Sequence, residues 1–147
     1  VLAGHFERGD AYADRIRALA AEPDLADSVS LAGASEPVPE LLARSAIGVL
    51  SSRSEGMPNA VLEYMAAGLP VAATDLPGIR QALGEAASHW LTPAGDAEAL
   101  AERLLELMKD PERRKEWGRR NRMRAETEFS VQALGDRTLA VLQEVRR

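Results

Sequence analysis

Two glutamates, Glu55 and Glu63, are separated by seven residues in a stretch that also contains Pro58. An apolar run at residues 46–50 precedes this stretch and predicts a buried strand. Apolar residues at helical spacing follow from Asn59 and predict a helix. Because the loop between them ends at a helix start, its backbone N–H groups and the positive end of the helix dipole suit a phosphate.

The two carboxylates suit a second kind of group. Carboxylates accept hydrogen bonds from hydroxyls, so Glu55 and Glu63 could each bind a sugar or a ribose. A phosphate at the helix start, with hydroxyls at both acids, describes a nucleotide sugar. The plainer alternative is a helix-capping Glu55 and a solvated Glu63, which is common for charges on helix faces.

The composition narrows the range of other functions. The chain has 147 residues and is 46% hydrophobic, which is enough for one domain with a core. Its net charge of -5 disfavours a nucleic-acid partner. Cysteine is absent, which excludes disulfides, thiolate metal sites and cysteine nucleophiles. No apolar stretch approaches the ~20 residues that span a bilayer.

Apolar strand-like segments alternate with helical patterns along the chain. The predicted strands are residues 1–4, 29–32, 47–50, 71–73 and 89–91. The predicted helices follow Asp10, Pro37, Pro58, Pro77-Gly78, Asp96, Asp110 and Ser130. Asp10 and Asp110 are predicted to cap the helices that follow them. The first helix is predicted to have Tyr12, Ile16 and Leu19 on its inner face, and the helix after Asp96 carries Leu100, Leu104, Leu105 and Met108 at helical spacing. The alternation predicts an α/β fold, a Rossmann-like parallel sheet with helices on both faces, followed by a helical C-terminal third.

One segment carries a specific resemblance. Residues 55–63, joined to Ala66-Ala67-Gly68-Leu69-Pro70-Val71, resemble the donor-binding half of family-four glycosyltransferases, which have the GT-B fold. The resemblance runs from about Val1 to Ser130. It implies a retaining enzyme that transfers a sugar from a nucleoside-diphosphate sugar to an acceptor hydroxyl, in polysaccharide or glycoconjugate assembly.

The resemblance also implies roles for particular residues. Glu55 would be the catalytic residue facing the transferred sugar, and Glu63 would bind the ribose. The backbone around the sugar and diphosphate would come from Gly56, Met57, Pro58, Asn59 and Ala60. The nucleotide base would be cradled by Ala32, Gly33 and Ala34. Pro58 stands where many members have Gly, so one N–H donor is lost, and the Asn59 side-chain amide is a candidate replacement.

In this family the domain begins with a further strand, which is central in the sheet, and with a loop carrying an Arg and a Lys that grip the diphosphate. Neither that strand nor that loop with its Arg and Lys is present here. The chain also opens without Met, in an apolar run. We therefore expect a fragment of a longer protein that lacks its first strand and helix. Residues 1–128 would form the donor-binding domain and residues 129–147 its C-terminal helix.

The expected partners are the nucleotide sugar and an acceptor glycan or lipid-linked glycan, held by an absent N-terminal domain. No metal and no cofactor are expected. The expected location is cytoplasmic, with the inner face of a membrane as the alternative, because the arginine-rich run 113–124 could bind a membrane surface. The acids within and around this run, Glu112, Glu116, Glu126 and Glu128, are typical of a solvated helix and favour the first location. His89 is expected at the surface rather than in catalysis.

Two other functions remain as alternatives. One is a non-catalytic α/β interaction module of similar fold, because a fold does not fix a function. The other is a dinucleotide-binding dehydrogenase domain, which is disfavoured because residues 4–9 lack the G-x-G-x-x-G spacing.

Overall fold

The computed structural model describes residues 1–4, 9–33 and 37–145, and the chain divides into two compact units, Val1–Leu41 and Leu42–Arg147. In the first unit, β1 (Leu2–Ala3) and β2 (Leu31–Gly33) pair in parallel. Helix α1 (Ala11–Ala20) lies between them in the sequence. As predicted, Asp10 caps α1, because its Oδ1 accepts a hydrogen bond from the Tyr12 N–H at 2.8 Å.

The inner face predicted for α1 is wrong in part. Tyr12 and Leu19 are exposed and Ile16 is half-buried, whereas Ala13 is the buried residue. The helical spacing is right, but α1 turns a small side chain inward, so its buried face is rotated by about one residue from the prediction. Helix α2 (Val38–Ala43) follows in the sequence, and the boundary between the two units falls within it.

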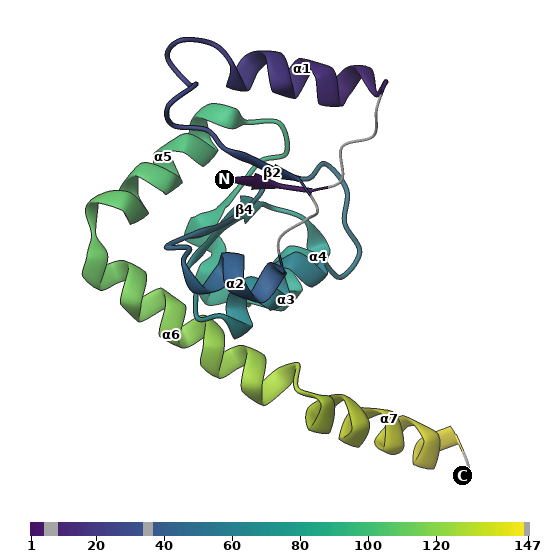
Figure 1. Ribbon diagram of the computed structural model, residues 1–147. Coiled ribbons are helices and arrows are strands. Elements are labelled where there is room, and N and C mark those ends of the chain that lie inside the picture. Colours follow the sequence, from purple (N-terminus) through teal and green to yellow (C-terminus); the bar gives the residue numbers. More distant parts are fainter. Residues whose placement is uncertain (5–8, 34–36, 146–147) are drawn as a thin grey trace. The chain divides into compact units, whose positions relative to one another are not determined.

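The second unit contains three parallel strands in the order β3-β4-β5, of which β4 is labelled in Figure 1. They are β3 (Gly48–Leu50), β4 (Val71–Thr74) and β5 (Leu91–Thr92). Helix α3 (Asn59–Ala66) connects the first two, while α4 (Pro77–Leu83) and the 3₁₀ helix η1 (Glu85–Trp90) connect the last two. All four residues of β4 are buried, as expected for a strand covered on both faces. These parallel strands flanked by helices confirm the predicted α/β, Rossmann-like fold class.

The C-terminal helices are α5 (Ala97–Lys109), α6 (Pro111–Glu128) and α7 (Val131–Val145). These helices begin where predicted, and the predicted cap Asp110 is confirmed. Asp96, Asp110 and Ser130 each accept a hydrogen bond from a backbone N–H three residues later. Helix α6 packs on α3, and the buried Asn121 side chain donates to the Leu69 carbonyl at 2.8 Å. This bond satisfies a buried carbonyl just before β4.

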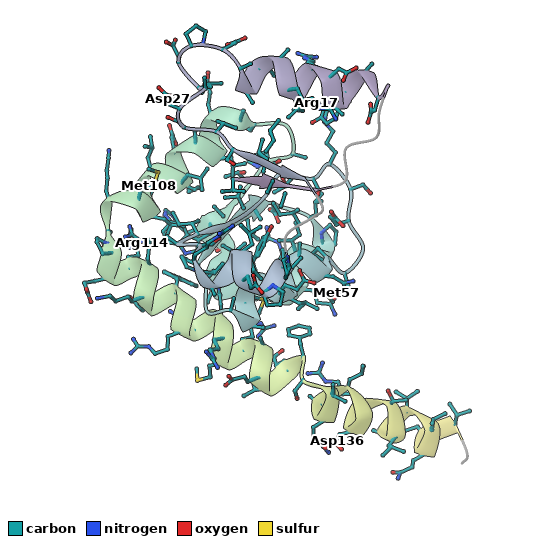
Figure 2. All side chains as sticks on the ribbon, viewed as in Figure 1. Arg17, Asp27, Met57, Met108, Arg114 and Asp136 are labelled. Carbon is teal, nitrogen blue, oxygen red and sulfur yellow. The ribbon has the colours of Figure 1, made fainter. Side chains whose placement is uncertain are left out.

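Two further predictions are right only in part. In α5, Leu100 and Leu104 pack against the core, but Leu105 and Met108 are exposed and the fully buried residue is Leu107. Met108 points outward in Figure 2. The last strand begins only at Leu91, because Trp90 lies in η1. Trp90 is buried there and packs edge-on against Trp117, with ring centroids 5.8 Å apart, so burial of the ring accounts for the apolar signal that suggested a strand.

Helix α7 differs from the other helices of the second unit. None of its side chains is buried, although its apolar residues repeat at helical spacing. Those that are exposed include Val131, Leu134, Leu139, Val141, Leu142 and Val145.

Candidate functional site

The loop between β3 and α3 lies at the carboxyl edge of the three-stranded sheet. Leu50 ends β3 opposite Ala73 of β4, and the Thr74 hydroxyl donates to the Leu50 carbonyl at 3.5 Å. Asp75, which follows β4, donates its N–H to the Thr92 carbonyl of β5. Open α/β sheets bind ligands outside this edge, so the loop occupies the position that such sites use.

Helix α3 begins at Asn59, as predicted, and Pro58 is its buried N-cap. Pro58 makes no side-chain capping bond, and its carbonyl accepts from the Val61 and Leu62 N–H groups at 3.1 and 3.3 Å. The N–H groups of Asn59 and Ala60 therefore precede the first hydrogen-bonded turn. Such groups, at the positive end of the helix, are suited to an anion.

Glu55 is half-buried and is held by a neighbour that the sequence analysis did not single out. The Ser52 hydroxyl donates to Glu55 Oε1 at 2.6 Å, a short charge-assisted hydrogen bond. The bond fixes one carboxylate oxygen and leaves lone pairs of the group for another partner. A hydroxyl three residues before a glutamate is the sequence signal that could have identified Ser52.

The rest of the loop is exposed. Gly56 and Met57 both lie at the surface, and Met57 is labelled in Figure 2. Their peptide bond lies directly against Gly78, at the start of α4.

Glu63 lies one turn into α3 and is exposed. It borders a cavity of about 400 Å³ whose walls are Leu62, Glu63, Ala66, Ala125, Glu126, Phe129 and Ser130. Its neighbour Tyr64 is half-buried, and its hydroxyl donates to the Val49 carbonyl at 3.3 Å. Burial raises the pKa of Tyr64, and the negative charge of Glu63 raises it further.

The structure places the predicted site residues in two groups. Seven of them, Glu55, Gly56, Met57, Pro58, Asn59, Ala60 and Glu63, lie together on the loop and first turns of α3 in the second unit. Ala32 and Gly33 are the last residues of β2 in the first unit, and Ala34 lies outside the described residues. Base binding by these three residues stays a prediction.

His89 is exposed in η1, and its Nε2 lies 2.7 Å from Glu106 Oε2. Four cations of the arginine-rich helix α6 pair with acids one turn away. These pairs are Lys115–Glu112, Arg120–Glu116, Arg122–Glu126 and Arg124–Glu128.

Across residues 1–4, 9–33 and 37–145, no helix is both long enough and apolar enough to cross a membrane. In the same residues, no three His, Asp or Glu side chains gather as a metal site would require.

Comparison with known proteins gives consistent matches. The family described as "Glycosyl transferases group 1" matches residues 1–124. The amylovoran biosynthesis glycosyltransferase AmsK of Erwinia amylovora is 38% identical over 101 residues, 63% of this chain and 25% of that protein. The putative colanic acid biosynthesis glycosyltransferase WcaL of Salmonella typhimurium is 31% identical over 140 residues, 89% of this chain and 34% of that protein.

A third relative is named for its donor. A GDP-mannose-dependent monoacylated alpha-(1-6)-phosphatidylinositol monomannoside mannosyltransferase of Corynebacterium glutamicum is 33% identical over 93 residues, 63% of this chain and 24% of that protein. The chain thus matches between a quarter and about a third of the length of these relatives.

Proposed function

Since the chain belongs to the family of group 1 glycosyl transferases, we propose that it is the donor-binding part of a longer, retaining glycosyltransferase. The enzyme would transfer a sugar from a nucleoside-diphosphate sugar to an acceptor hydroxyl. The acceptor would be held by a further part of the enzyme, so the chain alone is expected not to catalyse. A cytoplasmic location remains part of this proposal.

The observation that carries the proposal is the position of Glu55 just ahead of the helix start. The Ser52 hydroxyl holds its carboxylate, while α3 begins four residues later with the N–H groups of Asn59 and Ala60. When the diphosphate departs, these preorganised N–H groups would stabilise its growing negative charge. The sugar ring meanwhile gains positive charge, which a carboxylate fixed beside it would favour.

Glu63 would have a different task in the same site. It lies on the exposed side of α3, one turn after the first N–H donors, and borders the cavity described above. A carboxylate there suits the ribose hydroxyls of the nucleotide. Glu63 would therefore contribute to binding in the ground state, and Glu55 to the transition state.

The names of the relatives suggest the process in which the enzyme would act and the donor it would use. Two of them are named for the biosynthesis of amylovoran and of colanic acid, and one for dependence on GDP-mannose. We propose polysaccharide or glycoconjugate assembly as the process, with a nucleoside-diphosphate hexose as the donor.

Two substitutions in the longer enzyme test the proposal. Glu55→Ala should leave affinity for the free nucleoside diphosphate nearly unchanged and cut sugar transfer by roughly a hundredfold or more, the scale of one lost preorganised contact. Glu63→Gln should weaken nucleotide binding by about ten- to a hundredfold, as expected for a lost hydrogen bond to a charged group. Calorimetry measures the affinity, and a transfer assay with a panel of nucleotide sugars measures turnover.

Glu98→Ala, at an exposed position in the first turn of α5, is the matched control and should change neither quantity. If Glu55→Ala transfers sugar like the parent enzyme, this loop is not the sugar site. If the parent enzyme binds no nucleotide of the panel, the proposed function is itself wrong.

A further inference from the structure

The backbone conformation at residue 78 does not require glycine, although the residue there is Gly78. It lies in the first turn of α4, and its φ is not among the positive values found for Gly9, Gly33, Gly68, Gly84 and Gly95. Any residue could adopt this backbone conformation. Glycine is also less favourable than alanine within a helix, so local helix stability does not favour it.

The lack of space beside residue 78 explains why it is a glycine. A Cβ atom at this position would lie 1.5 Å from the Gly56 carbonyl oxygen, 2.6 Å from its carbonyl carbon and 3.4 Å from the Met57 nitrogen. All three atoms are backbone atoms of the loop before α3. The α4 backbone therefore contacts the Gly56–Met57 peptide bond directly, with no room for a side chain between them.

If a side chain were added, the loop would move rather than the helix. Ile79 and Ala82 are fully buried and Leu83 almost so, which anchors α4 in the core. Gly56 and Met57 are exposed, so burial does not anchor the loop at this point. Ordinary contact begins at 3.4 Å, so relief of the 1.5 Å approach requires the peptide to shift by roughly 2 Å.

We propose that Gly78 is a positioning residue that sets the orientation of the Gly56–Met57 peptide and, through it, of the adjoining Glu55 carboxylate. This inference rests on the proposed function, in which that segment faces the transferred sugar. Displacement of a reacting group by 1 Å can cost about a hundredfold in rate.

The position of Glu63 is independent of this contact. It lies on α3, which is anchored by the fully buried side chains of Val61 and Met65. A side chain at residue 78 would therefore disturb the sugar end of the site and leave the nucleotide end in place. The expected result is a loss of turnover without a matching loss of nucleotide affinity.

Gly78→Ala in the longer enzyme tests the proposal, with Gly118→Ala as the matched control. A Cβ at Gly118 would lie 2.1 Å from the Gly68 carbonyl oxygen, so the control has the same kind of backbone clash but beyond the opposite end of α3. Both variants should melt at a lower temperature than the parent. Only Gly78→Ala should reduce kcat for sugar transfer by about a hundredfold while the Kd for the free nucleoside diphosphate changes less than threefold.

Three outcomes are distinguishable. If Gly78→Ala loses kcat only to the extent that Gly118→Ala does, Gly78 has a merely structural role and the inference is overturned. If kcat and affinity fall together, Gly78 does not act on the sugar end, which also overturns it. If the parent enzyme neither binds nucleotide nor transfers sugar, the proposed function fails before the variants are compared.

A second variant, Pro77→Gly alone, covers the case in which Gly78→Ala does not fold. It adds no atom beside the Gly56–Met57 peptide, but it loosens the first turn of α4, because proline fixes φ at this helical position. Pro77→Gly should therefore lower kcat more than nucleotide affinity, relative to the parent enzyme. An equal loss of both would contradict the proposal.

Discussion

The ring of Tyr64, on α3, occupies the space that a side chain at Gly48, in β3, would need. A Cβ atom at Gly48 would lie 2.5 Å from Tyr64 Cδ2 and 2.6 Å from its Cγ. The Tyr64 hydroxyl reaches past this point to the Val49 carbonyl at 3.3 Å. This contact holds the helix of the candidate site against the strand that precedes it.

Gly48→Ala should lower the free energy of unfolding by about 1–3 kcal/mol, the usual cost of overpacking. In a Tyr64→Ala background the same substitution should cost at least about 1 kcal/mol less, because the ring is gone and the two residues are in direct contact. Urea unfolding of the two single variants and the double variant measures this coupling. Additive losses would show that Gly48 and Tyr64 do not compete for one space.

Ser52→Ala should lower sugar transfer by roughly tenfold or more, because the Glu55 carboxylate loses a hydrogen bond of the kind that is worth about 1.5–3 kcal/mol. Affinity for the free nucleotide should not change. Ser52→Thr keeps the hydroxyl and should retain most of the activity, and Ser54→Ala, at an exposed position in the same loop, is the control. Parent-like turnover in Ser52→Ala would mean that Glu55 does not depend on this bond.

Glu106 makes stability depend on pH in the acid range. The hydrogen bond from His89 lowers the pKa of Glu106, and the charges of His89, Arg103 and Arg113 lower it further, against the opposing effect of burial. The folded chain therefore holds this proton less tightly than the unfolded chain, whose glutamates have a pKa of about 4.3. The stabilisation is present above that pH and is lost as the pH falls through the lowered pKa.

Glu106→Gln should therefore show a shallower fall in Tm between about pH 5 and pH 3 than the parent chain. The control is Glu102→Gln, since Glu102 is more exposed and lies 3.7 Å from Arg103. It should keep the parent slope. If Glu106→Gln and the parent have the same slope, the cluster around His89 does not contribute to acid stability.

The starts of the helices could be predicted from the sequence because capping is local. Asp10, Asp96 and Asp110 each bond a backbone N–H two or three residues away, so no distant part of the chain decides them. The rotation of α1 and α5 was not predictable in the same way. Burial of Ala13 and Leu107 depends on what each helix packs against, which hydrophobic spacing alone does not specify.

In the candidate site, too, the features set by local sequence could be predicted and those set by packing could not. Glu55 in a loop and Glu63 one turn into α3 follow from the order of strand, loop and helix. The Ser52 bond depends on the conformation of that loop. The contact of Gly78 with Gly56 joins residues 22 positions apart and arises only when α4 packs into the core.

The exposure of helix α7 determines which part of the second unit unfolds locally. Its 15 residues include none that is buried, so little tertiary packing opposes its opening. An isolated helix of this length is marginal in water. Amide hydrogens of α7 should therefore exchange with solvent through local fraying, whereas those of the buried strand β4 should exchange only when the whole unit unfolds. The cooperative folding unit would accordingly end near Phe129, where the last partly buried apolar side chain meets the core.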